Sequence, residues 1–200
     1  MSSRTGRARL AARLAALQDP EQFALRPTKA GTVLDLGCGS KKWPGAVGLD
    51  VSSDTDADIV HDLDVFPYPL EPDAYDVVLM QDVIEHVEDL YGLMAEVHRI
   101  ARPRARVLVR TPHFSSMLAF SDPTHRHYLS LLAMSGLAEP GFAHYAATRF
   151  RVVSNRVDLW LPFRLAGLER LANRFPREYE AYFAFRFPAM NIRAELEVLK

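Results

Sequence analysis

The sequence predicts an α/β protein built on a doubly wound, seven-stranded sheet that is mostly parallel, with one antiparallel strand near the C-terminus. Five short apolar runs rich in β-branched residues come first, an amphipathic helix separates the last two of them, and two alternating runs lie near the C-terminus. Continuous apolar runs are typical of strands buried on both faces of a parallel sheet. The 200 residues, 48% of them hydrophobic, suit a single domain over residues 1–200.

The individual elements follow from these patterns in chain order. Apolar residues at positions 90, 93, 94, 97 and 100 recur at helical spacing, which predicts a helix over residues 88–101 that Pro103 stops. Residues 111–127 are rich in turn formers and histidine, which indicates a long functional loop leaving the fifth strand. Strands are expected at residues 32–36, 46–51, 57–61, 75–81, 105–110, 150–159 and 192–199, and further helices at residues 129–137, 164–174 and 178–185.

The N-terminal residues 1–20 combine arginines at 4, 7, 9 and 13 with leucines at 10, 14 and 17, which predicts a first helix with its arginines in solvent. A mitochondrial presequence or a basic amphipathic anchor would show the same pattern. The single cysteine, Cys38, cannot form an internal disulfide, and no run of about 18 uncharged apolar residues is present to span a bilayer. We therefore expect a cytoplasmic protein.

Charge is unevenly distributed along the chain. The formal net charge of −1 does not favour long nucleic acid or an anionic membrane as a partner, and no nucleic-acid-binding module is visible. Residues 43–98 contain no lysine or arginine but fourteen acids, whereas residues 99–200 contain sixteen basic residues and eight acids. One half of the molecule therefore suits a cationic ligand, and the other half an anionic or polar one.

The stretch VLDLGCGSKKWPGAVGLDV, residues 33–51, predicts a ligand site between two strand ends. Gly37 and Gly39 follow the first strand, where missing side chains let backbone N–H groups approach a ligand, although a tight turn explains a glycine pair equally well. Asp50 ends the next strand, and its carboxylate matches the two hydroxyls of a ribose. A dinucleotide fingerprint needs a third glycine that opens a helix, but Lys42 and Pro44 stand there, so a pyrophosphate site is poorly supported.

These residues resemble the first motif of the class I S-adenosylmethionine-dependent methyltransferases (methyltransferase type 11-like), an acid in a strand followed by G-x-G, here from Asp35 to Gly39. Further motifs follow in order within residues 30–112: the HDL stretch at 61–63, and MQDVIEHV at 80–87, which matches the family's EHV segment. The resemblance implies a Rossmann-like fold with S-adenosylmethionine as methyl donor and S-adenosylhomocysteine as product. It also implies that acids attract the cationic end of the cofactor and that Asp62 accepts from the adenine amine. The connections between the first three strands are shorter than is usual in the family, and this departure predicts a more open adenosine pocket. The cofactor-binding residues that it implies are Asp35, Gly37, Cys38, Gly39, Asp50, Val51, Asp62, Leu63, Gln81 and Asp82.

The loop after the fifth strand carries the candidate catalytic residues. His113 and His125 are candidate general bases for a hydroxyl acceptor, Asp122 would orient a histidine, and Arg126 would hold an anionic substrate group. Residues 122–126, DPTHR, resemble a segment found at this place in a subgroup of these enzymes that often accompanies polysaccharide and natural-product pathways. His86 faces the pocket in the expected fold and is a candidate substrate-binding residue. Alternatively, Asp122 is only a turn or helix cap and the histidines only satisfy backbone groups.

A metal site in the same loop is chemically possible, because imidazole and carboxylate groups suit zinc or iron. The residues concerned are His113, Asp122, His125 and His127. Their spacing matches no recognised ligand signature, so we expect no metal.

Together these patterns predict a methyltransferase that acts on a small molecule or glycan, more readily at oxygen than at nitrogen or carbon. Residues 111–190 would form its substrate side. Two alternatives stay open: an S-adenosylmethionine-binding sensor or scaffold without turnover, and a nicotinamide-dependent oxidoreductase. The aromatic residues and arginines between positions 142 and 190 suit an acceptor pocket, a homodimer face, contact with a lipid-linked substrate, or plain core packing.

Overall fold

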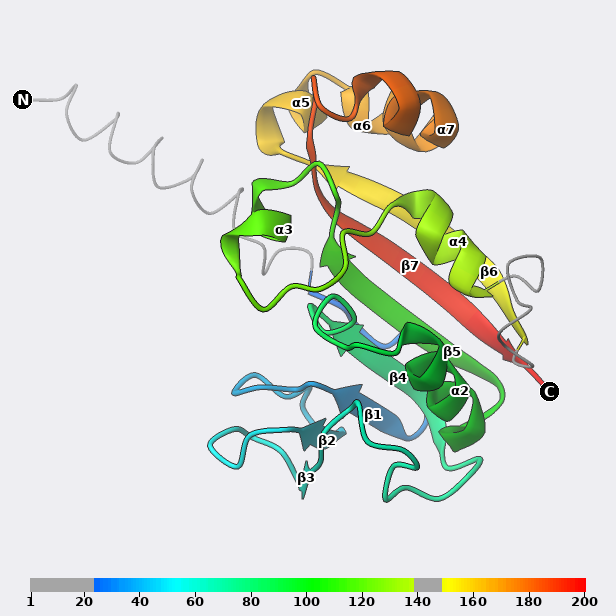
Figure 1. Ribbon diagram of the computed structural model, residues 1–200. Coiled ribbons are helices and arrows are strands. Elements are labelled where there is room, and N and C mark those ends of the chain that lie inside the picture. The colour runs from blue at the N-terminus through cyan, green and yellow to red at the C-terminus, as the bar shows by residue number, and fades with distance from the viewer. Residues whose placement is uncertain (1–23, 139–148) are drawn as a thin grey trace, which may run out of the picture.

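The computed structural model describes residues 24–138 and 149–200, and in this part of the chain a seven-stranded sheet with the order β3-β2-β1-β4-β5-β7-β6 forms the centre of the molecule (Figure 1). The helix expected at residues 1–20 lies outside the described residues. The strands are β1 (Val33–Leu36), β2 (Val47–Asp50), β3 (Ile59–Val60), β4 (Tyr75–Gln81), β5 (Ala101–Pro112), β6 (Arg149–Leu159) and β7 (Ala189–Leu199).

The strand directions confirm the predicted α/β fold. Strands β1 to β5 pair in parallel, and β7 runs antiparallel to both of its neighbours, β5 and β6. The chain moves outward from β1 to β2 and β3, and then returns to place β4 on the other side of β1. This reversal creates a switch point at the carboxyl ends of β1 and β4, where open α/β sheets bind their ligands.

Helix α2 (Leu90–Ile100) matches the predicted helix, but Pro103 does not separate it from the next strand as expected. Asp89 caps the helix by accepting a hydrogen bond from the Gly92 N–H, and β5 begins at Ala101, directly after the helix. The expected turn before the fifth strand is instead an irregularity at the start of β5, where the register against β4 shifts and Arg104 has a φ of +63°. Proline is tolerated there because the ladder is already interrupted.

The other helices are shorter than the sequence suggests. The loop predicted at residues 111–127 contains α3 (Met117–Ser121), which Ser116 caps at its N-terminus. Gly167, with a φ of +76°, divides the predicted helix 164–174 into α5 (Leu161–Leu165) and α6 (Leu168–Arg174). The remaining helices are α4 (Leu131–Ala138), α7 (Pro176–Glu178) and a π-helical turn, η3 (Tyr179–Phe183).

The two faces of the sheet are covered very differently. Helices α2 and α4 lie on one face, and their apolar side chains join those of all the long strands in one large core (Figure 1). On the other face a small cluster of Leu25, Val77, Leu79 and Leu108 is buried. The described connections between β1, β2, β3 and β4 contain no helix, so loops alone build the sheet edge near β3. Helices α3 and α5 to α7 lie beyond the carboxyl ends of β5 and β6 (Figure 1).

Candidate functional site

A pocket of about 310 Å³ lies at the switch point, beside the carboxyl ends of β1, β2 and β4. Ten residues line it: Gly37, Asp50, Val51, Asp62, Leu63, Asp64, Asp82, Val83, His86 and Val87. Six of them are among the ten residues predicted to bind the cofactor. A smaller hollow of about 100 Å³ adjoins it at Gly37 and includes Asp35, Cys38 and Gln81 in its lining.

The turn between β1 and β2 depends on glycine at two positions. Gly37 and Gly39 both have positive φ, at +65° and +53°. A Cβ on Gly37 would lie 2.5 Å from Cγ2 of Val83, whereas a Cβ on Gly39 would meet no atom within 4 Å. The Gly39 N–H donates to Oδ2 of Asp50 at 2.9 Å, and the Ser52 N–H donates to Oδ1 at 3.0 Å. The carboxylate at the end of β2 is therefore fixed at the pocket by main-chain donors on both sides.

Gly37→Ala is expected to lower the stability of the chain by about 2–4 kcal/mol, because it combines a strained φ with a clash against the Val83 side chain. Urea unfolding measures this change. Gly45→Ala is the matched control, since Gly45 has a φ of +81° and open space around its Cβ position. If both substitutions cost the same, the contact with Val83 is not what requires glycine at position 37.

The acids around the pocket differ in environment. Asp35 is buried, which raises the pKa of its carboxyl, and the Trp43 N–H donates to it at 2.8 Å. Asp82 follows β4 with a φ of +55° and forms an ion pair with the buried Arg110 of β5, through two guanidinium nitrogens. Burial raises the pKa of the Cys38 thiol to about 11, so this thiol is neutral at physiological pH and is no nucleophile.

His113, one of the two candidate bases, is fully buried at the end of β5. Its Nδ1 lies 2.8 Å from Oγ of Ser115, whose backbone N–H also points to this nitrogen. Its Nε2 lies 3.1 Å from Oε1 of Glu180, which also accepts from the Leu131 N–H. Both ring nitrogens therefore have partners within the protein, Ser115 beside β5 and Glu180 of η3, an arrangement that favours a structural role.

The second half of the predicted loop is fastened to the turn that follows β4. The N–H groups of Arg126 and His127 donate to the Glu85 carbonyl at 2.8 and 3.2 Å, and Nε2 of His127 lies 2.8 Å from the Val87 carbonyl. Arg126 itself is half-exposed and pairs with Glu88 at 2.6 Å. These contacts bring residues 122–127 to the pocket rim.

Asp122 is connected to a histidine by hydrogen bonds that pass through the hydroxyl group of Thr124. Its Oδ1 accepts from the Thr124 N–H and from the Thr124 hydroxyl at 2.8 and 2.7 Å. Because that hydroxyl donates to Asp122, it accepts from Nδ1 of His86 at 2.9 Å. The histidine that Asp122 orients is therefore His86, which sequence reasoning had placed at the pocket without a partner.

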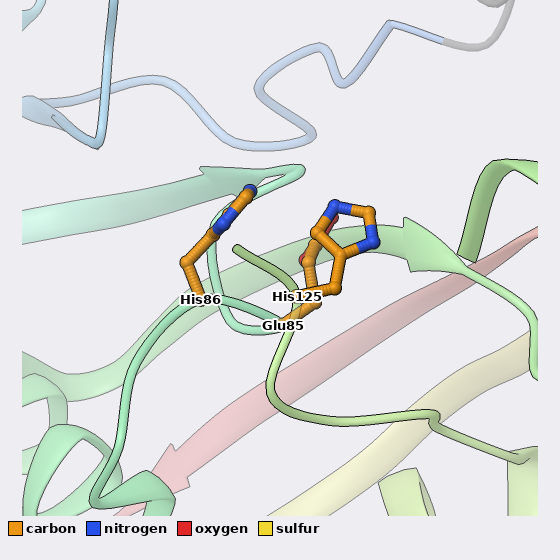
Figure 2. Close-up of side chains that lie close together, drawn as sticks. All are labelled: Glu85, His86 and His125. Atoms are coloured by element: carbon orange, nitrogen blue, oxygen red, sulfur yellow. The ribbon is translucent and has the colours of Figure 1, made fainter. Parts of the chain in front are cut away.

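Glu85, His86 and His125 converge at the pocket rim from the turn after β4 and from the fastened loop (Figure 2). One donor atom from each of the three side chains lies within 4.8 Å of the others, and the two imidazole rings are 4.6 Å apart between centroids. Burial raises the pKa of the Glu85 carboxyl to about 8, and burial together with the neighbouring His125 lowers the pKa of His86. From the sequence, Glu85 stands with His86 in the EHV segment as a pair at a strand end, which favours a structural role, so Glu85 is not among the predicted site residues.

The four residues considered as metal ligands from the sequence do not converge in the described part of the chain. His113 and His127 have the separate partners given above, and Asp122 contacts Thr124. Of these four, His125 alone belongs to a group whose donor atoms lie close enough together to hold an ion.

The C-terminal helices form an apolar cavity of about 300 Å³ between α6, η3 and β6. Several aromatic side chains near it are exposed: Phe175, Tyr182, Phe183 and Phe185. The homodimer expected from this region stays a prediction. In the described residues, no helix has the length and apolar character that a membrane span requires.

Comparisons with known proteins agree with this geometry. A sequence profile described as a methyltransferase domain matches residues 7–159. Among solved structures, S-adenosylmethionine-dependent methyltransferases from Mesorhizobium loti and Archaeoglobus fulgidus are similar, with 16% and 15% identity and TM-scores of 0.57 and 0.58. The alignments cover 93% and 98% of this chain, and 96% and 94% of those chains.

A third similar structure is a complex of the Haloferax volcanii Trm112 methyltransferase activator with a methyltransferase, at 19% identity and a TM-score of 0.59, covering 98% of this chain and 95% of that one. At such identities the structures establish the fold alone. No curated protein matches the chain. The sequence profile spans more than half of the chain and the observed fold agrees with it, which confirms the resemblance drawn from residues 33–51: the chain belongs to the methyltransferase domain family.

Proposed function

We propose that this protein transfers a methyl group from S-adenosylmethionine to a hydroxyl of a small molecule or glycan. The observation that carries the proposal is the Asp50 carboxylate, held by main-chain donors at the end of β2 and facing the pocket beside Gly37. An acceptor-only group at this place suits the two hydroxyls of a ribose. The similar structures from Mesorhizobium loti and Archaeoglobus fulgidus are S-adenosylmethionine-dependent by name, which supports this donor.

The two adjoining hollows fit the two halves of this cofactor. The adenosine half belongs in the larger pocket, with Asp50 at the ribose and Asp62 at the adenine amine. The methionine half belongs in the smaller hollow beyond Gly37, near Asp35 and Gln81. Carboxylates at both places attract the sulfonium and the α-ammonium, which are cations.

The acceptor side is assigned to the rim formed by His86 and His125. In methyl transfer the acceptor oxygen attacks the methyl carbon, the carbon–sulfur bond breaks, and its electrons stay on sulfur, giving neutral S-adenosylhomocysteine. The hydroxyl proton must leave, and we propose that His125 is the base that accepts it. Its Nδ1 faces the Ala119 carbonyl at 2.9 Å and therefore carries the hydrogen, so its Nε2 has a lone pair to receive a proton. Arg126 at the same rim would hold an anionic group of the acceptor.

The cofactor is tested by a thermal-shift titration with S-adenosylmethionine, S-adenosylhomocysteine and NADH. A ligand present at about a hundred times its Kd adds about 2.7 kcal/mol of stability. For a chain of this size, this raises the Tm by about 5–10 °C. We expect this shift with the two sulfur compounds and none with NADH. A shift with NADH alone would favour the oxidoreductase and overturn the proposal.

Turnover is tested separately with His125→Ala. We expect this variant to bind S-adenosylhomocysteine like the wild type and to lose at least about a hundredfold in S-adenosylhomocysteine production with hydroxyl acceptors, because general bases contribute rate factors of about 10²–10⁴. His98→Ala is the control, because it removes a histidine from helix α2 and should leave turnover unchanged. If the wild type binds the cofactor but turns over no hydroxyl, amine or carbon acceptor, the chain is a sensor or scaffold.

A further inference from the structure

The cluster of Glu85, His86 and His125 combines a buried carboxyl group with two imidazoles, and binding of the methyl donor does not require this combination. Glu85 is 1% exposed, and its Oε2 accepts from the Thr111 hydroxyl at 2.9 Å. Its other oxygen, Oε1, is buried and has no hydrogen-bond partner among the described residues. An unpaired carboxyl oxygen in a protein interior costs free energy unless a further group binds to it.

The two histidines are oriented so that each presents a free lone pair. Nδ1 of His125 donates to the Ala119 carbonyl, and Nδ1 of His86 donates to the Thr124 hydroxyl, whose own hydrogen goes to Asp122. In its neutral form each ring therefore carries its hydrogen on Nδ1 and presents the lone pair of Nε2. Neither Nε2 has a hydrogen bond within the described part of the chain. Histidine ligands of metals typically show this pattern, in which the other ring N–H is fixed by a carbonyl or a carboxylate network.

We propose that Glu85, His86 and His125 bind one first-row divalent cation of the zinc or iron class, through Oε1 of Glu85 and the Nε2 atoms of the two histidines. Two imidazoles and one carboxylate are a ligand set of catalytic zinc and of non-haem iron sites. Bonds of about 2.0–2.2 Å place the donor atoms of one ion about 3–4 Å apart. One candidate ligand atom from each of the three side chains lies within 4.8 Å of the others, so small side-chain rotations would be enough to bring the donors around one ion. Figure 2 shows how the three side chains lie.

The fixed backbone around the cluster supports this assignment. Glu85 and His86 are neighbours in the turn that begins at Val83, where the His86 N–H donates to the Val83 carbonyl at 3.0 Å. His125 comes from a distant part of the sequence, but the Arg126 N–H bond to the Glu85 carbonyl fixes it beside them. The three ligands are thus positioned before any ion arrives, which lowers the cost of binding.

The position of the cluster indicates what the ion would do, a step that rests on the proposed function. His86 lines the proposed adenosine pocket, so an ion held by its Nε2 lies at the border between donor and acceptor. Three protein ligands leave at least one coordination position open. An acceptor hydroxyl bound there has a lowered pKa and loses its proton to solvent before its oxygen attacks the methyl group. In the cation-loaded form His125 is a ligand, and the ion replaces it in activating the hydroxyl.

The test measures cation binding without cofactor or acceptor. Full-length protein is treated with a chelator, dialysed, and titrated with Zn²⁺ by calorimetry and with Co²⁺ by visible absorption. We expect one equivalent per chain and Co²⁺ bands of a site with nitrogen and oxygen ligands. Glu85→Gln and His125→Ala each should weaken Zn²⁺ binding by at least about a hundredfold, since even the loss of an outer partner costs about 10–100-fold. Thr124→Val, which removes the partner of His86, should weaken it by about 10–100-fold.

Two controls separate this inference from the proposed function. His98→Ala removes a histidine on α2 and should leave Zn²⁺ binding unchanged. Asp50→Ala should lose S-adenosylhomocysteine binding and keep Zn²⁺ binding. Zn²⁺ affinities that are equal in the wild type, Glu85→Gln and His125→Ala, or no Zn²⁺ binding by the wild type, overturn the cation site and leave the proposed function standing. Zn²⁺ binding that depends on these residues in a protein that binds neither sulfur compound supports the site and overturns the function.

Discussion

Asp50→Ala is expected to weaken the binding of S-adenosylhomocysteine about a hundredfold, which corresponds to about 2.8 kcal/mol. The substitution removes the carboxylate that we place at the ribose, and charged hydrogen bonds of this kind contribute about 1.5–3 kcal/mol each. It also leaves the N–H groups of Gly39 and Ser52 without their acceptor, so the turn after β1 loses its support. Isothermal titration calorimetry with purified wild type and variant measures the change.

Asp54→Ala is the matched control for this experiment. Asp54 is an exposed acid in the loop that follows β2, and its replacement removes the same charge near the pocket without removing a pocket-lining side chain. We expect Asp54→Ala to bind within about twofold of the wild type, because exposed charges act weakly through solvent. Equal losses in both variants would mean that net charge, rather than contact with Asp50, governs affinity.

Leu196→Ala is expected to lower the free energy of unfolding by about 2–5 kcal/mol. Leu196 lies in the middle of β7, is fully buried, and stands between Val107 of β5 and Val152 of β6. Its truncation leaves a cavity in the largest core of the molecule, where close packing prevents the neighbours from filling the space. Urea unfolding followed by circular dichroism measures the loss, which lowers the Tm by about 5–15 °C in a chain of this length.

Leu199→Ala in the same strand supplies the comparison. Leu199 is 40% exposed at the end of β7, so the same truncation there should cost less than about 1 kcal/mol. The ratio between the two variants tests whether β7 is the packed centre of the C-terminal half. Similar costs at both positions would contradict the burial of Leu196.

The pocket at the strand ends could be predicted from the sequence because its residues follow strands that are themselves easy to recognise. Asp35, Gly37 and Asp50 are at or next to strand ends, and parallel strands bring their carboxyl ends to one edge. Each of these strands is one short, mostly apolar run of residues, so the strand can be recognised from its own stretch of sequence. The departures include places where single residues decide, such as Gly167, which divides a predicted helix, and the start of β5 at Ala101, directly after α2.

The surroundings of His125 could be predicted only in part, since they depend on contacts that no periodic pattern reveals. His125 was identified as a candidate base, but its neighbours Glu85 and His86 come from a turn far away in the sequence. The contact is made by backbone bonds to the Glu85 carbonyl, which any side chain at position 126 or 127 would permit. For the same reason the sequence could not reveal the partner of His113, the other candidate base, because Glu180 comes from η3, near the other end of the chain.

The fastening of the loop at Arg126 and His127 to the Glu85 carbonyl has an evolutionary consequence. Main-chain hydrogen bonds hold this loop beside the turn after β4, so the loop keeps its shape when the side chains facing outward from it change. Exposed positions in this loop, such as Arg126 and Tyr128, are therefore free to vary between related proteins without loss of the scaffold. Under the proposed function, a new acceptor preference can arise here by single substitutions, while the strand ends at the proposed cofactor pocket stay as they are.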